Sequence, residues 1–125
     1  MQIGLNNIQA EQSVIGRMLI NAMSDRAIYA IEKLRPDDFS QQIHKHIWQE
    51  MLSMSSRNAE IDLVTLMEAL RNSGNDVEFS YLGEITKNTP SQANMKRYAE
   101  IVKDYAKLRN ANASLHNALA VINDN

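Results

Sequence analysis

The sequence of 125 residues contains no cysteine, so it can form neither disulfide bonds nor thiolate metal sites. Its four glycines, Gly4, Gly16, Gly74 and Gly83, are scattered singly, which excludes the Gly-rich turns that hold nucleotide phosphates. No apolar run approaches the roughly 20 residues of a membrane span, and the first residues lack the basic flank and apolar core of a signal peptide. We therefore expect a cytoplasmic protein without membrane contact or a nucleotide site.

Charge of either sign is also limited. Lys and Arg number 13 against 15 Asp and Glu, a net charge of −2, which argues against a chain that binds DNA by neutralising phosphates alone. The +3 charge of residues 92–110 contrasts with −4 for residues 1–91 and −1 for residues 111–125. The basic residues of this segment could meet phosphates or an acidic partner, or form a solvated face. They are Lys96, Arg97, Lys103, Lys107 and Arg109.

The amino-acid composition favours helices. Hydrophobic residues make up 44% of the chain, enough for one domain with a sizeable core. Only two prolines interrupt segments rich in Ala, Leu, Met, Gln, Glu and Lys, and no segment alternates with the period of a strand. We predict an all-α fold with a compact head of about five short helices in residues 1–91 and one long helix in residues 92–125.

Capping residues and apolar spacing predict the first two helices. The pair Asn6-Asn7 can cap a helix that ends near Met23, and Glu11 lies favourably in its first turn. Either Ser24 or Asp25 can cap a second helix, which Pro36 stops. The residues expected to face inward are Ile8, Ile15, Leu19 and Ala22 in the first helix and Ile28, Ile31 and Leu34 in the second.

The same signals predict three further helices in the head. Ser40 is the expected cap of the third, which a polar turn at residues 53–60 follows. Asp62 is the expected cap of the fourth, residues 72–75 close it, and residues 88–90 end the fifth. The inward residues predicted for these helices are Ile43, Ile47, Trp48, Met51 and Leu52, then Leu63, Leu66, Met67 and Leu70, then Tyr81, Leu82 and Ile85.

The segment from Ser91 to Ile122 holds neither proline nor glycine and predicts one helix of about 30 residues, roughly 45 Å long. A head of 90 residues has a radius of gyration of only about 12 Å, so the distal turns should project. A heptad seam alternates spacings of four and three along this helix: Ile101, Tyr105, Leu108, Asn112, Leu115, Leu119 and Ile122. Asn112 takes an a-type position, where a polar residue fixes register and partner number.

The sequence contains no recognisable arrangement of catalytic or metal-binding residues. The two histidines of His44-Lys45-His46 stand two residues apart and point to different sides of a helix, unlike helical zinc ligands. The pair Asp37-Asp38 sits at a turn between helices, where capping is a more ordinary role than acid/base work. Ser91 and His116 form no nucleophile arrangement with the aspartates. We predict no catalytic, cofactor or metal residue.

Large apolar and aromatic residues suggest core or interface roles. The seven methionines are interpreted mainly as gap-fillers of a helical core, with a binding surface as the alternative. Phe39 and Trp48 are predicted core anchors. Tyr98 and Tyr105 lie on the projecting helix and are better interface candidates. These assignments describe a helical protein that works by protein contacts.

Four stretches occur in order along the chain: residues 10–16 (AEQSVIG), residues 37–39 with 44–48 (DDF and HKHIW), residues 61–66 (IDLVTL), and residues 81–82 with 88–91 (YL and NTPS). Residues 94, 98–99 and 101–102 (N, YA and IV) continue the match. Jointly they resemble the N-terminal domain of DnaB-type replicative DNA helicases over residues 6–110. Departures at Arg17, Ser40 and residues 78–80 indicate a divergent member, encoded by a bacterium, a phage or a plasmid.

The resemblance implies a noncatalytic module of a hexameric helicase. In this family an all-helical head precedes a long helical hairpin, hairpins of neighbouring subunits pair, and the domains form a collar of dimers. The collar receives the C-terminal domain of primase and influences loading. ATP and Mg²⁺ chemistry and 5′ to 3′ unwinding belong to a separate C-terminal RecA-like domain. The long helix of this chain would be the first hairpin arm, and we expect a fragment that lacks the second arm.

The residues expected to carry subunit contacts combine the seam and its shoulder: Tyr98, Ile101, Val102, Tyr105, Leu108, Asn112, Leu115 and Leu119. The alternative for residues 98–108 is packing against the head. Arg97, Lys103 and Lys107 are expected, as exposed residues, to contact primase or a loader. Little direct DNA binding is expected. Two other functions remain open: a free-standing adaptor or inhibitor that binds primase or a helicase ring, and a small DNA-binding protein that uses Lys96, Arg97, Lys103 and Lys107.

Overall fold

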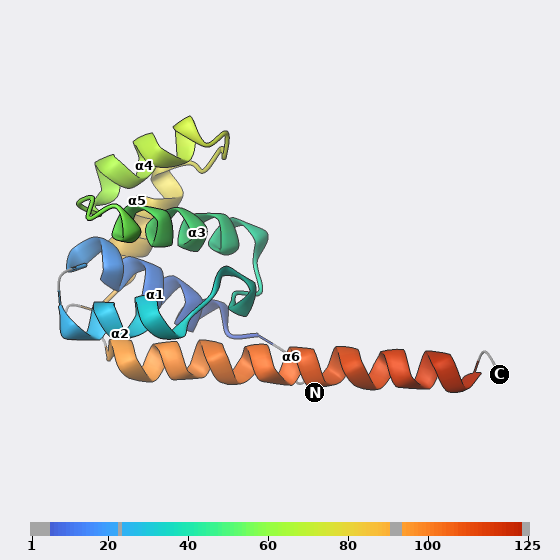
Figure 1. The fold of residues 1–125 in the computed structure, drawn as a ribbon. Helices are drawn as coiled ribbons and strands as arrows, with labels where there is room; N and C mark the ends of the chain where they lie inside the picture. The colour runs from blue at the N-terminus through green and yellow to red at the C-terminus, as the bar shows by residue number, and fades with distance from the viewer. Residues whose placement is uncertain (1–5, 23, 91–93, 124–125) are drawn as a thin grey trace.

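The computed structural model describes residues 6–22, 24–90 and 94–123, and the regular structure within these ranges is entirely helical (Figure 1). The elements are α1 (Ile8–Ile20), α2 (Asp25–Lys33), the 3₁₀ turn η1 (Pro36–Asp38), α3 (Gln42–Ser56), α4 (Leu63–Asn72), α5 (Phe79–Asn88) and α6 (Met95–Asn123). Helices α1 to α5 form the head, and α6 runs along one side of it and extends beyond it (Figure 1). The predicted all-α class and long last helix are confirmed. Within the described ranges, none of the helices is both long and apolar enough to cross a membrane.

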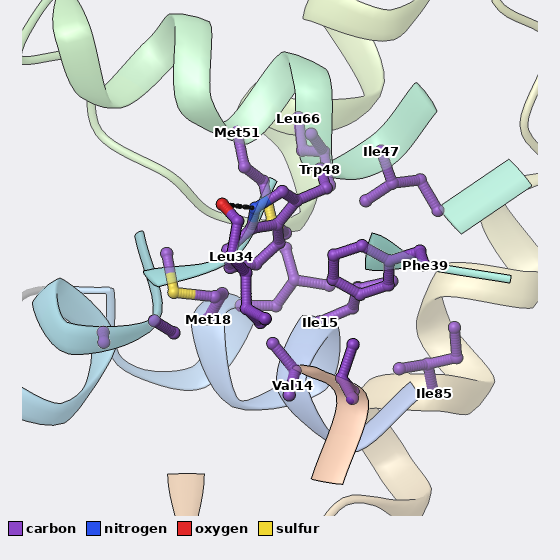
Figure 2. Packing of buried hydrophobic residues seen from close by; sticks show 14 of the residues in the cluster. Val14, Ile15, Met18, Leu34, Phe39, Ile47, Trp48, Met51, Leu66 and Ile85 are labelled. Carbon is purple, nitrogen blue, oxygen red and sulfur yellow. Dashed lines mark hydrogen bonds between the residues drawn. The ribbon is translucent and has the colours of Figure 1, made fainter. Parts of the chain in front are cut away.

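The core of the head is built around Trp48 and Phe39, both fully buried as predicted (Figure 2). Their ring centroids lie 5.2 Å apart, and the Trp48 indole Nε1 donates a hydrogen bond of 3.0 Å to the carbonyl oxygen of Leu34. That bond satisfies the polar end of the tryptophan and fixes the end of α2 against α3. Four methionines join the same core, in agreement with their interpretation as gap-fillers: Met18, Met51, Met54 and Met95.

Three of the predicted helix caps are present. Asn7 caps α1 by accepting a hydrogen bond from the backbone N–H of Ala10, and Ser24 caps α2 in the same way through Ala27. The Asp62 side chain caps α4, accepting from the Thr65 N–H at 2.8 Å. The predicted close of α4 is also confirmed, because Gly74 takes the left-handed conformation at φ +81°.

Other boundaries differ from the predictions. Helix α1 ends at Ile20 rather than near Met23, which lies outside the described residues, as does Ser91, the predicted start of the last helix. The N-cap of α3 is Gln41 and not Ser40, because the Ser40 side chain is engaged elsewhere. Helix α3 continues to Ser56, so the predicted polar turn starts later than residue 53.

The inward faces of the first two helices were also predicted incorrectly in part. Ile8 and Ile28 are 41% and 47% exposed. Small residues occupy the buried positions instead: Ala10 in α1, and Ala27 and Ala30 in α2. Buried alanines suit a helix that packs closely against its neighbours, and α2 contacts both α1 and α6. Apolar spacing alone favours the larger isoleucines that lie beside the alanines in the sequence. Leu66 and Leu70 of α4 and Leu82 and Ile85 of α5 are buried as expected.

Candidate subunit interface and the buried network behind it

The first half of α6 is packed against the head by one narrow stripe. Met95, Ala99, Val102 and Ala106 recur at spacings of four, three and four, and each is at most 3% exposed. Helix α6 contacts α1, α2 and η1 along this stretch. The first turns of α6 are therefore part of the domain core.

Several predicted interface residues lie in or beside this stripe. Val102 belongs to it and is buried in the core. Tyr98 and Ile101 are partly buried and pack against the core, while Tyr105 is partly buried one turn farther along. For Tyr98, Ile101 and Val102 the structure thus shows the head packing that was the alternative interpretation.

The distal half of α6 presents a different surface. Leu108, Leu115, Leu119 and Ile122 are exposed apolar residues, with Leu115 58% and Ile122 67% exposed, and Asn112 lies among them. We call these five residues the distal seam. They follow the heptad spacing predicted from the sequence. The C-terminal part of α6 extends beyond the head (Figure 1). A row of exposed apolar side chains at this spacing is typical of a helix that packs against another helix.

The basic residues of α6 are mostly engaged within the domain. Lys103 is only partly exposed and forms an ion pair with Asp38 at 3.0 Å, which corrects the expectation that it is a free surface residue. Arg97 is exposed and faces Glu100 at 3.5 Å on the same helix. The Lys96 ammonium lies 5.5 Å from the centre of the Tyr29 ring. Lys107 is exposed. Arg97 and Lys107 therefore remain the accessible docking candidates.

Behind α6, a buried polar network connects α1 to α3 and α5. Glu11 is 1% exposed, and its carboxylate receives hydrogen bonds from the hydroxyl and the backbone N–H of Ser40. The His44 Nδ1 lies 2.8 Å from the same carboxylate, and its Nε2 lies 2.7 Å from the Tyr81 hydroxyl. Gln12 donates to that hydroxyl at 3.2 Å. Donation from the His44 Nδ1 to the Glu11 carboxylate, inferred from the partners, links the carboxylate, the imidazole and the Tyr81 hydroxyl in one hydrogen-bonded chain.

The Glu11 carboxylate is ionised despite its burial. Burial by itself would raise its pKa, but hydrogen bonds from His44 and Ser40 and the charge of His44 outweigh burial and lower the pKa below the ordinary value. Every buried side-chain nitrogen and oxygen among the described residues has a hydrogen-bond partner. The network therefore links α1, α3 and α5 through buried hydrogen bonds.

The role of Glu11 was missed by sequence reasoning, which gave it only a favourable place near the helix N-terminus. A signal was present, because Glu11 shares one helical face with Val14, Ile15 and Met18, all buried. A charged residue on an apolar stripe predicts a buried partner. The His44-Lys45-His46 motif supplies that partner: His44 is buried, whereas His46 lies nearer the surface and bonds to Gln42 at 2.9 Å.

A groove lies beside the first turns of α6. It has a volume of about 580 Å³ and lies between α1, α5 and the first turns of α6, where Tyr98 and Ile101 line it. Its lining is rich in amide and hydroxyl side chains, and its one charged side chain is Glu84. The groove therefore lies at the head end of α6, whereas the distal seam begins at Leu108.

Comparison with known proteins identifies the family. The family described as "DnaB-like helicase N terminal domain" matches residues 4–104. The replicative DNA helicase DnaB of Pasteurella multocida is 43% identical over 107 residues, and the replicative DNA helicase DnaC of Bacillus subtilis is 37% identical over 106. These alignments cover 83% and 82% of this chain but only 22% and 23% of the relatives' length.

A solved structure gives the same result for the fold. The crystal structure of the N-terminal domain of DnaB helicase from Mycobacterium tuberculosis aligns with a TM-score of 0.83 and 31% sequence identity. The alignment covers 92% of this chain and 83% of that one. The helical head and the long last helix are therefore those of a known domain, and the chain belongs to the DnaB-like helicase N-terminal domain family.

Proposed function

We propose that this chain is the noncatalytic collar domain of a replicative hexameric DNA helicase, and that its distal seam pairs subunits within the ring. The observation that carries the proposal is the exposed row Leu108, Leu115, Leu119 and Ile122 on the projecting part of α6. Membership of the DnaB-like family supplies the context, since its relatives are replicative helicases. ATP hydrolysis and Mg²⁺ binding are assigned to a separate ATPase domain of the parent helicase.

Pairing along the seam follows from the hydrophobic effect. Each exposed leucine or isoleucine that becomes buried contributes about 1.5–3 kcal/mol relative to full exposure. Asn112 would then lie between apolar layers, where an unpaired amide is unfavourable unless it meets a polar group of the neighbouring helix. The amide thereby selects one register and limits the number of helices that can pack together.

The partner assignments rest on the accessible cations of α6. We propose that Arg97 and Lys107 contribute to binding the C-terminal domain of primase or a helicase loader, with Lys103 a weaker candidate because of its ion pair with Asp38. Direct DNA binding is not favoured, because Lys96, Lys103 and Arg109 are all directed to groups of the head. Loss of primase affinity in the double variant R97E/K107E, measured by calorimetry, would support this assignment.

Sedimentation velocity over a range of micromolar concentrations tests the pairing. The wild-type chain is expected to self-associate, and the double variant Leu115→Lys with Leu119→Lys is expected to sediment as a monomer at every concentration. Val64→Lys is the matched control, because Val64 is a 71% exposed apolar residue on α4 and belongs to the head. Association that persists in the seam variant, or a wild-type chain that stays monomeric, would contradict the proposed interface.

A further inference from the structure

One residue of the head contacts α6 in two places. The carboxylate of Asp38, in η1, pairs with the Lys103 ammonium at 3.0 Å, and the backbone carbonyl of Asp38 accepts a hydrogen bond of 2.6 Å from the Arg109 guanidinium. The same carboxylate accepts the Arg35 N–H at 2.8 Å, which holds the turn itself rigid. Asp38 is only 8% exposed. We call Asp38, Lys103 and Arg109 the η1 clamp.

The η1 clamp opposes movements of α6 that the apolar stripe resists only weakly. Next to η1 the stripe consists of Val102 and Ala106, and such small apolar contacts oppose sliding or rocking only weakly because they lack direction. Lys103 and Arg109 are six residues apart, about 9 Å along the helix axis. Because both reach the same residue of η1, a movement of α6 along or about its axis lengthens at least one of the two contacts.

The position of the clamp gives it leverage over the distal seam. From Met95 to Arg109 the helix rises about 21 Å, and from Arg109 to Asn123 it rises about 21 Å again. A rigid helix that pivots at Met95 therefore moves at its far end about twice as far as it moves at Arg109. A displacement of about 2 Å at the clamp becomes about 4 Å at the end of the seam.

We propose that Asp38 is a positioning residue that sets the direction in which the distal seam leaves the head. The purpose of this positioning rests on the proposed function, because two seams can pair only if both helices leave their heads at a compatible angle. The clamp itself is a property of one chain. It can therefore be measured independently of pairing.

The absence of cysteine makes a distance measurement direct, since two introduced cysteines would be the only labelling sites. Spin labels at Gln49→Cys on α3 and Asn117→Cys on α6 report the distance from the head to the projecting arm, and both positions are exposed. Dilution with excess unlabelled protein keeps the pulsed electron-spin measurement intramolecular. The parent double-cysteine protein is expected to give one narrow distance distribution.

Variants of the clamp should change that distribution. Lys103→Met with Arg109→Met is expected to broaden it by several ångströms, and Lys103→Arg is expected to keep it narrow because the cation is retained. Lys96→Met is the matched control: it removes a cation from the same helix close to the pivot and should leave the distribution narrow. Trp48 fluorescence and circular dichroism establish that each head is folded.

Asp38→Asn provides a second test should the double variant fail to fold. It retains an acceptor for Arg35 N–H but removes the charge that Lys103 meets, so intermediate broadening is expected. A narrow, unchanged distribution in the folded clamp variants would overturn the inference. Sedimentation of the same proteins separates the two proposals. If the chains pair but the clamp variants leave the distance distribution unchanged, only the clamp is rejected. If the clamp variants broaden the distance distribution but the chains never pair, the seam is rejected and the positioning role of Asp38 stands.

Discussion

Gly16 and Gly83 both lie inside helices, yet alanine at the two positions should have opposite effects on stability. Gly16 is on α1 where it meets the end of α5, and a Cβ atom there would lie 2.0 Å from the Thr89 Oγ1 and 3.1 Å from the Ile85 Cγ2. Gly83 is on α5, and a Cβ atom there would have nothing within 4 Å. The close approach of α1 to the end of α5 is therefore built around the missing side chain of Gly16.

The expected magnitudes follow from this geometry. Alanine stabilises a helix interior by about 1 kcal/mol relative to glycine, so Gly83→Ala should raise the free energy of unfolding by up to that amount. At Gly16 the same gain is opposed by overpacking, which typically costs about 1–3 kcal/mol, and contacts of 2.0 and 2.9 Å to Thr89 place this site at the upper end. A net loss of about 2 kcal/mol corresponds to a fall in Tm of roughly 6–12 °C in a domain of this size.

Thermal unfolding followed by circular dichroism measures both effects. Gly16→Ala should melt well below the wild type and Gly83→Ala slightly above it. The double variant Gly16→Ala with Thr89→Ala should recover part of the loss, because it removes the Thr89 hydroxyl, whose oxygen makes the shortest contact with the new Cβ. A Gly16→Ala protein as stable as Gly83→Ala would refute the close-packing argument.

Two further predictions concern the buried network. Glu11→Ala should lower the free energy of unfolding by about 3–5 kcal/mol in urea titrations, since it leaves buried donors of Ser40 and His44 unpaired, whereas exposed Glu84→Ala should change it by less than about 0.5 kcal/mol. Because the folded pKa of Glu11 is lowered from 4.5, its ionisation adds stability that is present above pH 4.5 and is lost as the pH falls through the folded value. The Tm difference between wild type and Glu11→Gln should therefore narrow in acid below pH 4.5, and a difference that stays constant would show that the Glu11 charge plays no part.

Features with local causes were predictable from the sequence. Asn7, Ser24 and Asp62 cap their helices through hydrogen bonds to residues three positions ahead, so the chemistry is contained in a few neighbouring letters. The same holds for Gly74, whose left-handed conformation ends α4. Trp48 and Phe39 were assigned to the core because large aromatic residues on an amphipathic helix or beside it have few other favourable places.

Features that depend on residues distant in the sequence could not be predicted from it. Ser40 is a reasonable helix cap by local rules, but the Glu11 carboxylate, 29 residues away in sequence, takes its hydroxyl and moves the cap to Gln41. Lys103 looks like a solvated cation until the fold brings Asp38 to it across 65 residues. In both cases the deciding energy is a charge-assisted bond between elements whose proximity only the tertiary structure sets.

Helix α6 shows why a periodic pattern alone could not assign its partners. The core stripe of Met95, Ala99, Val102 and Ala106 and the predicted heptad seam that starts at Ile101 alternate spacings of four and three and lie side by side on the helix. Val102 was therefore placed among the interface residues although it packs in the core. The two stripes differ in residue size: after Met95 the buried stripe continues with Ala99, Val102 and Ala106, whereas leucines dominate the row that stays exposed beyond Arg109. Small residues permit close packing against a head that is already formed, whereas large exposed ones are favourable only if another surface covers them. The change from buried to exposed apolar residues along α6 thus marks where the helix leaves its own head, and the proposed subunit pairing would cover the exposed part.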